Sequence, residues 1–492
     1  MVVSRRAVLG AAALGIAGLA GCTVAGAATG PSTGPPTGPP TGPAAAPGMP
    51  DQPPPDWEGL RSRLTGALVL PGDPGYDTAR LSHNTLFDGR RPAAVAACAN
   101  PSDVQACLEF ARGAGVPVAA RSGGHSYAGY SVPDGGLVID VAGMAGVEIA
   151  PDGSATIGAG ARLGDVCAAV GGAGRALPAG SCPSVGVAGL TLGGGIGVLT
   201  RAYGLTCDRL VSARVVTPDS TLRTVSERED PDLFWALRGG GGGNAAVVTS
   251  FTFATEAAPT VTVFSLRFPA GAAADVLPAW QAWASAAPDE LWSTCALSSG
   301  SPPGARIAGS FLGGESACRD QLAGLLAGVP APTSQVVSTK DYLAAMRWFA
   351  GSSDRETFVA SSRVLPAPLP DPAALVALLD RPRGIAVLLD TLGGAAGRVD
   401  PAATAFPHRT AFASAQVYAS AAGDPAPPTT AVAEVRDGLG ALTGTTGYVN
   451  YIDPGMPDWA EAYYGANLPR LRETVARYDP DRVLAFPQSA DA

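Results

Sequence analysis

Two nucleophilic side chains lie on glycine-rich segments of this chain, 57 positions apart. His125 lies in RSGGHSY (residues 121–127), and Cys182 lies in GSCPSVGVAGLTLGGG (residues 180–195). Glycine allows positive φ angles and close approach of a ligand to the backbone, so each segment can point N–H groups at an anion. An imidazole and a thiol on two such turns indicate a phosphate-bearing cofactor that the backbone holds and that is attached covalently.

The first segment can cradle a pyrophosphate with the backbone N–H groups of Ser122, Gly123 and Gly124, while His125 projects toward the reactive ring of the cofactor. From the residues alone, two plainer interpretations stay open. A histidine on a glycine turn can be purely structural, and a free cysteine is most often a small hydrophobic residue of the core.

Further motifs accompany these segments: RAYGLTCD (201–208), DLFWALR followed by five glycines and Asn244 (232–244), TAFPHR (404–409) and GYVNYID (447–453). Together they resemble the berberine-bridge-enzyme-like family of FAD-linked oxidases, which has the vanillyl-alcohol-oxidase fold with a PCMH-type FAD-binding domain. The resemblance covers residues 80–255 and 385–490 and is thin between them. Ala245-Ala246 stands where the family usually has Phe-Gly, so the conformation of that loop is an open question.

The resemblance implies a doubly tethered FAD, bonded through its ring to His125 and Cys182. Val185 matches a position that controls oxygen access in the family, and valine there resembles the oxygen-reactive form. The resemblance also implies cofactor contacts from both glycine segments, a later strand and the C-terminal motif: Arg121, Ser122, Gly123, Gly124, Ser126, Gly180, Val185, Gly186, Gly189, Gly193, Gly194, Gly195, Val248, Tyr448 and Asn450.

Three residues are predicted to act on the substrate. Tyr451 matches the candidate base of the family, Asp390 matches a carboxylate that hydrogen-bonds to this tyrosine, and Tyr127 is a further contact. A tyrosine with its ordinary pKa of about 10 is a poor base near neutral pH and needs a lowered pKa or an acceptor for its proton. A nearby carboxylate raises a tyrosine pKa, so Asp390 helps only by accepting that proton. Each tyrosine could instead be a strand aromatic whose hydroxyl is satisfied locally.

The elements that must position these residues have helix and strand signals. An N-cap at Asp56 predicts a helix bearing Trp57, Leu60 and Leu64 on one face, and residues 103–114 have helical spacing. Residues 137–141 and 214–217 are typical of buried strands, and a strand at 385–389 follows helices at 272–287 and 372–379. GGGIG (193–197) is not part of a strand–GxGxxG–helix unit with a later acidic residue, so it does not predict a Rossmann fold.

We therefore expect an α+β protein with three parts. A two-lobed FAD-binding domain of the PCMH type spans residues 56–259, and a substrate domain with an antiparallel sheet covered by helices spans 260–445. Residues 446–492 are expected to return to the first domain, as the resemblance implies.

The first 22 residues resemble an export signal. Arg5-Arg6 precede an apolar stretch, as in a Tat signal, and Leu19-Ala20-Gly21-Cys22 resembles a lipoprotein cleavage box with Cys22 as the lipidated residue. The apolar stretch is too short and too rich in glycine for a good spanning helix. Residues 23–55 are rich in Pro, Gly and Thr and are predicted to form an extended spacer. These features predict Tat export and a lipid anchor on the outer face of the cell membrane, or secretion if the signal is an ordinary one.

The net charge and the histidine and cysteine content of the chain limit which ligands it can bind. The formal net charge of −9 argues against nucleic acid. His83, His125 and His408 have no metal-ligand spacing and there is no Cys-x-x-Cys, so no metal site is predicted, and His408 is expected to be structural. In an exported protein, the remaining cysteines can form disulfides or stay as buried thiols, and the sequence leaves both open: Cys98, Cys107, Cys167, Cys207, Cys295 and Cys318.

The expected function is that of a secreted FAD-dependent oxidase. A hydride would pass from a substrate alcohol carbon to the flavin, Tyr451 would take the hydroxyl proton, and O2 would reoxidise the flavin to give H2O2. Two tethers retain a cofactor without a deep closed pocket, so an open cleft for an oligosaccharide is the first expectation. Two alternatives remain: oxidation of a phenolic or polyketide-type product, and a non-catalytic surface-anchored binding module, for which Ala245-Ala246 is the only hint.

Overall fold

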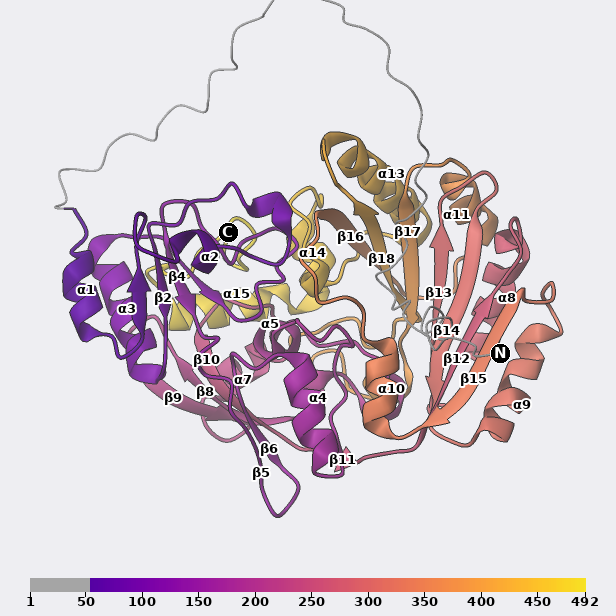
Figure 1. Ribbon diagram of the computed structural model, residues 1–492, viewed down its shortest axis with the longest axis horizontal. Coiled ribbons are helices and arrows are strands. Elements are labelled where there is room, and N and C mark those ends of the chain that lie inside the picture. Colours follow the sequence, from indigo (N-terminus) through magenta and orange to yellow (C-terminus); the bar gives the residue numbers. More distant parts are fainter. Residues whose placement is uncertain (1–53) are drawn as a thin grey trace, which may run out of the picture.

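The computed structural model describes residues 54–492 (Figure 1). The export signal, the lipidation site at Cys22 and nearly all of the expected spacer lie outside the described residues. Within the described part of the chain, no helix combines the length and the apolar character that crossing a bilayer requires.

The first lobe begins with a small mixed sheet. Strands β2, β4 and β3 are parallel, and β1 adds antiparallel to β2. The helix predicted after Asp56 forms, because the Asp56 carboxylate accepts a hydrogen bond from the Gly59 N–H and Leu60 is buried. The elements are α1 (Trp57–Arg63), β1 (Ala67–Val69), α2 (Tyr76–Ala79), η1 (Thr85–Phe87), β2 (Ala94–Ala97), α3 (Pro101–Ala114), β3 (Val118–Arg121) and β4 (Leu137–Asp140).

The second lobe is built on a five-stranded antiparallel sheet with the order β5-β6-β10-β8-β9. Its helices carry the second glycine segment toward the middle of the molecule (Figure 1). The elements are β5 (Val147–Ile149), β6 (Ala155–Gly158), α4 (Leu163–Gly172), β7 (Arg175–Ala176), α5 (Val187–Leu192), α6 (Thr200–Tyr203), η2 (Thr206–Arg209), β8 (Leu210–Val216), β9 (Leu222–Ser226), α7 (Pro231–Ala236), β10 (Val247–Phe253) and β11 (Glu256–Ala257).

A seven-stranded antiparallel sheet with the order β15-β12-β14-β13-β17-β18-β16 dominates the rest of the chain. Its helices α8, α9, α11 and α13 cover one face, where Phe264 and Leu266 join Trp280 in a buried cluster. The elements are β12 (Val261–Arg267), α8 (Ala273–Ser285), β13 (Leu291–Ser298), β14 (Gly304–Phe311), α9 (Glu315–Leu326), β15 (Ser334–Lys340), α10 (Tyr342–Phe349), β16 (Phe358–Leu365), α11 (Pro372–Leu379), β17 (Ile385–Thr391), α12 (Gly394–Gly397), β18 (Ala413–Ser420) and α13 (Ala426–Thr443).

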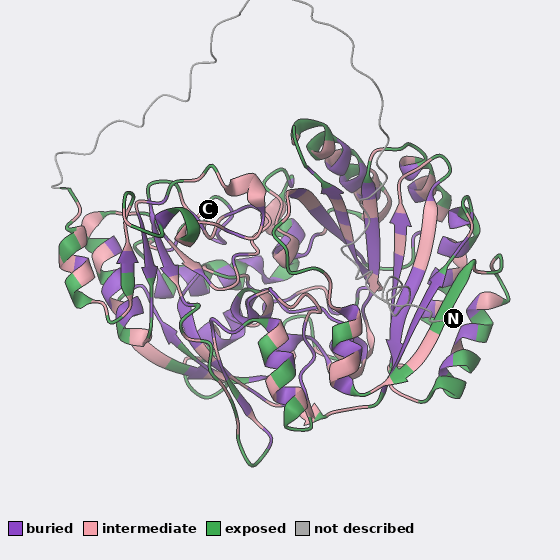
Figure 2. Ribbon diagram, viewed as in Figure 1, coloured by how far each residue is buried: buried purple, intermediate pink, exposed green. Residues whose placement is uncertain are grey.

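The two faces of this sheet have different neighbours. Side chains alternate along each strand, so the face opposite the helices turns toward the first two lobes. Figure 2 shows that the central strands are buried, whereas the edge strand β15 is largely exposed. The sheet therefore presents one wall to the middle of the molecule, which is where the site lies.

The C-terminal segment returns to the second lobe. It comprises η3 (Val449–Tyr451), α14 (Trp459–Tyr464), η4 (Gly465–Asn467) and α15 (Leu468–Tyr478). The Tyr478 hydroxyl donates to Asp230 at 2.8 Å, and the Ala490 N–H donates to the Asn244 side chain at 2.9 Å. The Asn450 amide of the C-terminal motif donates to the Leu190 carbonyl at 2.9 Å, which places this motif beside the second glycine segment.

The α+β class is confirmed, and several elements match their predicted limits closely. α11 spans the predicted 372–379, whereas α3 begins two residues before the predicted 103 because Pro101 suits the first turn of a helix that Asn100 caps. The cysteines, left open by the sequence, are free thiols in the described residues, and all but Cys182 are buried.

Candidate active site

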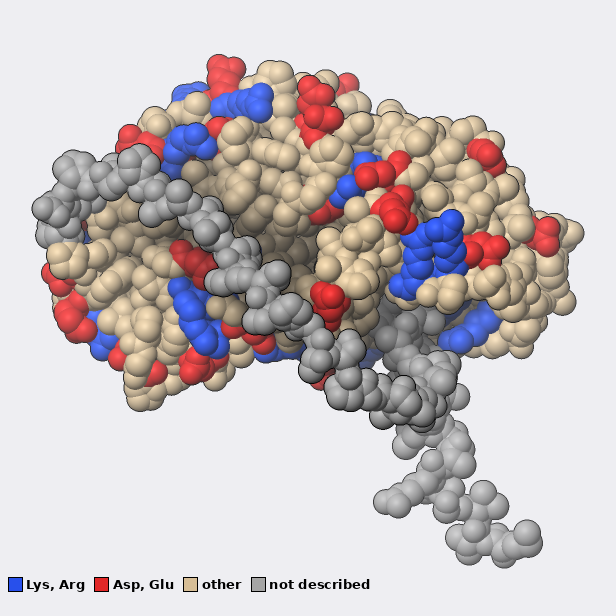
Figure 3. Space-filling model, turned by 90° about the horizontal axis from the view of Figure 1, so that it is seen from above, with Lys and Arg blue, Asp and Glu red and all other residues tan. Residues whose placement is uncertain are grey.

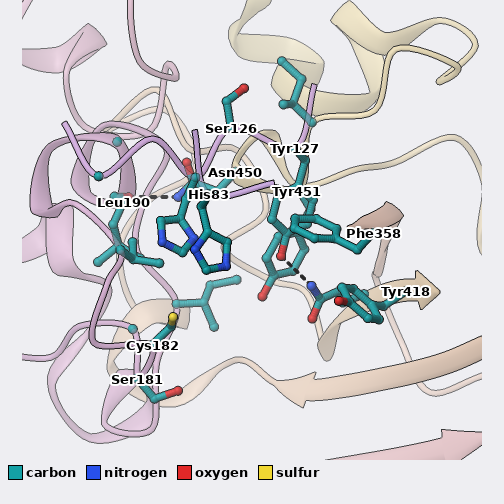
Figure 4. Close-up of a pocket in the computed structure, with 18 of the residues that line it drawn as sticks. His83, Ser126, Tyr127, Ser181, Cys182, Leu190, Phe358, Tyr418, Asn450 and Tyr451 are labelled. Carbon is teal, nitrogen blue, oxygen red and sulfur yellow. Dashed lines mark hydrogen bonds between the residues drawn. The ribbon is translucent and has the colours of Figure 1, made fainter. Parts of the chain in front are cut away.

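A cavity of about 1030 Å³ lies between the first two lobes and the seven-stranded sheet. This volume is at the upper end of the range for small-molecule sites and suits a large ligand together with a substrate. Residues of both glycine segments, of β13, β14, β17 and β18 and of the C-terminal motif line the cavity, and Figure 4 shows part of this lining.

Most residues predicted from the sequence meet in this cavity. The lining includes the predicted catalytic residues Tyr127, Asp390 and Tyr451 and the predicted cofactor contacts Arg121, Ser122, Gly123, Gly124, His125, Ser126, Gly180, Cys182, Val185, Gly186, Gly189, Val248 and Asn450.

Four predicted cofactor contacts lie outside the lining: Gly193, Gly194, Gly195 and Tyr448. They pack behind the cavity wall, where the Tyr448 hydroxyl accepts hydrogen bonds from the N–H groups of Gly195 (3.0 Å) and Ile196 (3.3 Å). A Cβ on Gly193 would lie 2.1 Å from Asn450 Oδ1, and one on Gly195 would lie 2.3 Å from Thr206 Oγ1. These residues therefore shape the wall through close packing.

The two glycine segments touch each other backbone to backbone. A Cβ on Gly123 would lie 2.2 Å from the Gly186 nitrogen, and a Cβ on Gly186 would lie 2.2 Å from Ser122 Oγ. The Ser122 hydroxyl in turn donates to the Ala159 carbonyl at 2.6 Å. Only glycine allows this approach, so the packing of the turns fixes the relative position of His125 and Cys182.

The Arg121 side chain stabilises the first glycine turn through an ion pair and hydrogen bonds. Its guanidinium is buried and binds the Asp140 carboxylate through Nη2 (2.5 Å) and Nε (3.1 Å). The same side chain donates to the carbonyls of Ala79 and Leu81. Because its donors are occupied in this way, Arg121 acts as a support for the turn.

His125 and Cys182 share one neighbour, Ser184. The Ser184 hydroxyl lies 3.1 Å from His125 Nε2 and 3.5 Å from Cys182 Sγ. Burial, followed by the nearby His83, lowers the pKa of His125 to about 3. The imidazole is therefore neutral at physiological pH, which leaves one ring nitrogen free to act as a nucleophile.

His83 is a site residue that the sequence did not reveal. Its ring stacks on that of His125, with centroids 3.8 Å apart and an interplanar angle of 18°. The His83 backbone N–H donates to the Gly124 carbonyl at 3.0 Å, which ties it to the glycine turn. Burial lowers the pKa of His83 as well, so two neutral rings stack without repulsion. A lone histidine without a motif gives no signal of such a contact.

The first turn has free backbone donors. Within the described residues, the N–H groups of Gly123, Gly124 and His125 donate to no other group, although they line the cavity. On the second turn, Gly189 is exposed, and a Cβ there would have no atom within 4 Å. Free donors, open space and two nucleophiles fit a cofactor that carries a pyrophosphate and a reactive ring.

Two tyrosines, Tyr127 and Tyr451, line the cavity on the side of the seven-stranded sheet. The part of the cavity between them and the two histidines is called the reaction space below. Tyr127 and Tyr451 stack with centroids 5.4 Å apart, and Figure 4 shows them between His83 and Tyr418. The Gln416 amide of β18 donates to the Tyr127 hydroxyl at 2.6 Å. Burial raises the pKa of both Tyr127 and Tyr451, so both phenols are protonated at neutral pH.

Asp390 lies on β17 and points into the cavity. Burial raises the pKa of its carboxyl to about 6, so it is mostly ionised at pH 7. The expected hydrogen bond to Tyr451 is not formed: among the described residues, none joins these two side chains. Burial raises the pKa of Tyr451 most, and the charges of Tyr127 and Asp390 raise it further.

The altered loop at Ala245-Ala246 is well packed. Both alanines are buried, and neither is among the residues with positive φ, so the backbone does not need glycine there. Asn244 donates to the Gly240 carbonyl at 2.7 Å and accepts from Ala490. The loss of the aromatic residue therefore leaves the loop intact.

The remaining sequence predictions concern metals and His408. Within residues 54–492, no group of three or more His, Cys, Asp or Glu side chains is arranged to hold a metal ion. His408 is half-buried and lies outside the cavity lining, and burial of its ring lowers its pKa to about 4.

Comparison with known proteins identifies the relatives of this chain. Residues 92–226 match the family model described as FAD binding domain, and residues 447–490 match the model described as berberine and berberine like. The chain is 37% identical to the uncharacterized FAD-linked oxidoreductase YgaK of Bacillus subtilis over 442 residues, which cover 87% of this chain and 97% of the relative.

Two carbohydrate oxidases are also similar. The xylooligosaccharide oxidase of Thermothelomyces thermophilus is 34% identical over 442 residues, covering 81% of this chain and 87% of its own. A solved structure of the glucooligosaccharide oxidase of Acremonium strictum, described with a 6-S-cysteinyl, 8α-N1-histidyl FAD, matches with a TM-score of 0.80 and 28% identity. That match covers 87% of this chain and 97% of the oxidase.

Proposed function

This chain belongs to the berberine-bridge-enzyme-like FAD-linked oxidoreductases, with a PCMH-type FAD-binding domain, and on that premise we propose that it oxidises a CH–OH group of an oligosaccharide. The observation that carries the proposal is that His125, Cys182 and Tyr451 open onto one cavity. The similarity to xylo- and glucooligosaccharide oxidases supports this choice of substrate.

His125 and Cys182 are the proposed attachment points of the flavin. The neutral imidazole and the thiol lie on either side of Ser184, on turns whose mutual contact holds them in place. The free N–H groups of Gly123, Gly124 and His125 would bind the phosphates. An FAD held there would supply an acceptor for the hydride of the substrate carbon and a route for its electrons to O2, with H2O2 as the product.

Tyr451 is proposed to take the proton of the substrate hydroxyl. Because burial and Asp390 hold its pKa above the usual value, this phenol can accept a proton only if its own proton leaves. Asp390 is a carboxylate of the cavity wall that is ionised above about pH 6 and can receive that proton. Catalytic hydrogen bonds are often long without substrate, so a bound hydroxyl can complete the connection between the two side chains.

The cavity wall formed by the seven-stranded sheet offers the flat apolar and polar surfaces that bind a sugar. Trp292, Phe358 and Tyr418 line it and offer flat apolar surface, and Gln416 adds an amide among them. Val185 lines the opposite side, and we propose that its small side chain leaves room for O2 at the flavin.

A substrate screen tests this proposal. The protein from a flavin-replete host should release peroxide with xylo-, cello-, chito- or maltooligosaccharides, in amounts equal to the sugar acid formed. Aromatic alcohols at the same concentration serve as the comparison. Peroxide from the aromatic alcohols alone would favour oxidation of a phenolic product, and a protein without flavin and without peroxide release would favour the binding module.

We also propose that the chain is exported by the Tat route and anchored through a lipid on Cys22, from the twin arginines and the cleavage box. Wild-type protein should sediment with membranes, and Cys22→Ser should move it to the soluble fraction. An Arg5→Lys, Arg6→Lys chain should stay in the cytoplasm. A Cys22→Ser protein that still partitions with membranes would contradict the anchor.

A further inference from the structure

Two arginines stand opposite each other on the sheet wall of the cavity. Arg267 at the end of β12 pairs in register with Arg306 of β14, and both line the cavity. Directly paired residues of antiparallel strands point to the same face, so the two guanidinium groups share one region of the wall. Like charges in this arrangement destabilise a strand pair unless something compensates them.

No acidic side chain of the described residues compensates this pair. Neither Arg267 nor Arg306 forms an ion pair there, and the Arg306 Nε donates only to the Ser265 hydroxyl, at 3.1 Å. Two other buried arginines have a carboxylate partner: Arg121 binds Asp140 and Arg409 binds Asp208. On the face shown in Figure 3, many basic side chains likewise lie beside acidic ones. Burial, followed by the charge of Arg267, lowers the pKa of Arg306.

The sheet register places this pair at a defined distance from the tyrosines. Arg306 is opposite Ala296 of β13, which is opposite Leu388 of β17, which is opposite Gln416 of β18. Gln416 donates to Tyr127 in the reaction space. Three strand spacings of about 4.8 Å therefore separate Arg306 from Gln416, roughly 14 Å in all. Ala296 and Leu388 between them are uncharged, so a chain of one or two sugar units can lie across them.

The charge at the other end of the sheet has the opposite sign. Glu356 lines the cavity and comes just before β16. This strand forms the edge of the sheet opposite the edge near β12. An anionic substituent is repelled there and attracted to the arginine end, so charge gives an extended substrate one direction in the cavity.

We propose that the substrate is an oligosaccharide that bears a carboxylate, as a uronic acid does, and that this carboxylate binds between Arg267 and Arg306. The inference rests on the proposed function and specifies its substrate class. The planar guanidinium groups match the two oxygens of a carboxylate, and the sugar one or two units away is the one that is oxidised.

Two matched disaccharides test the proposal. Cellobiouronic acid and cellobiose differ only in a carboxylate on the non-reducing sugar, and both present the same reducing glucose. The wild-type protein should oxidise the acid with a kcat/KM about 10- to 100-fold higher, chiefly through a lower KM. Added salt should reduce this preference. Arg267→Gln together with Arg306→Gln should abolish this preference, so that the ratio of the two kcat/KM values falls to about one.

Control variants separate the site from a general loss of structure. Arg306→Lys keeps the charge and should retain part of the preference, and Arg228→Gln removes an exposed, unpaired arginine on the loop after β9 and should change nothing. Equal kcat/KM for the two disaccharides in the wild type would overturn the proposal. An Arg267→Gln, Arg306→Gln variant that lowers kcat/KM for both disaccharides by the same factor would also overturn it.

Calorimetry distinguishes this inference from the proposed function. If cellobiouronate binds to the wild type but not to the Arg267→Gln, Arg306→Gln variant, the anion site is supported. If neither sugar is oxidised in that case, only the oxidase assignment fails. Oxidation of cellobiose without measurable binding of the acid overturns the anion site and leaves the oxidase assignment standing.

Discussion

Tyr451→Phe should lower kcat by about 10²- to 10⁴-fold and leave the flavin in place, because it removes one oxygen from the reaction space and keeps the ring. The ring stacks on Tyr127 and packs edge-on against Tyr448, and phenylalanine preserves both contacts. Stopped-flow measurement of flavin reduction under anaerobic conditions isolates this step from reoxidation. Tyr203→Phe, on a half-buried tyrosine outside the cavity lining, is the matched control.

The pH profile gives this prediction a second readout. The pKa of Asp390 is raised to about 6, so its carboxylate becomes protonated, and unable to accept a proton, as the pH falls through 6. The rate of flavin reduction in the wild type should therefore drop about tenfold per pH unit below that value. Asp390→Asn should be slow at every pH and lose this dependence. A Tyr451→Phe protein that reduces its flavin at more than a tenth of the wild-type rate would refute the role of the phenol.

Loss of both nucleophiles should change how the flavin is held. After acid precipitation, a His125→Ala, Cys182→Ala protein should give a colourless pellet, whereas each single variant should keep a yellow one through the remaining bond. FAD that binds without a bond stabilises a protein by mass action, about 2.7 kcal/mol at 100 times its Kd. The melting temperature of the double variant should therefore rise with added FAD, while that of the wild type stays constant.

Peptide mass mapping identifies the bonds directly. FAD mass should appear on the peptides that contain His125 and Cys182 in the wild type. Cys318→Ala, which removes a buried thiol far from the cavity, is the control for the cysteine change. A double variant that still carries flavin after precipitation would show that another residue forms the bond.

Most of the helices and strands that were predicted correctly follow from short, local sequence patterns. α3 follows from the helical spacing of its apolar residues, α11 from a Pro- and Ala-rich stretch, and β4 from a short apolar run bounded by turns. The same holds for His125 and Cys182, because a nucleophile on a glycine-rich turn is a local signal. Such signals survive folding because the neighbouring residues alone determine them.

The residues that the sequence misplaced depend on contacts between distant segments. Gly193, Gly194 and Gly195 form a glycine run that suggests a ligand, yet the partners that require glycine are Asn450, Phe406 and Thr206. His83 and the pair Arg267 and Arg306 have no motif at all. Their roles come from ring stacking and strand register, which appear only once the chain is folded.

The position of Tyr451 on the cavity wall, late in the chain, has a consequence for how the cofactor is loaded during biosynthesis. On the ribosome, Tyr451 emerges roughly 16 to 65 s after His125 and roughly 13 to 54 s after Cys182 at the usual rates of translation. Until then the nascent chain can form the glycine turns but cannot enclose a ring against them, because the wall opposite is missing. Flavin captured early, before it bonds to His125 or Cys182, would remain exposed to water and free to leave. The order of the chain therefore makes stable cofactor loading a post-translational event, and a stalled or shortened polypeptide should accumulate without flavin.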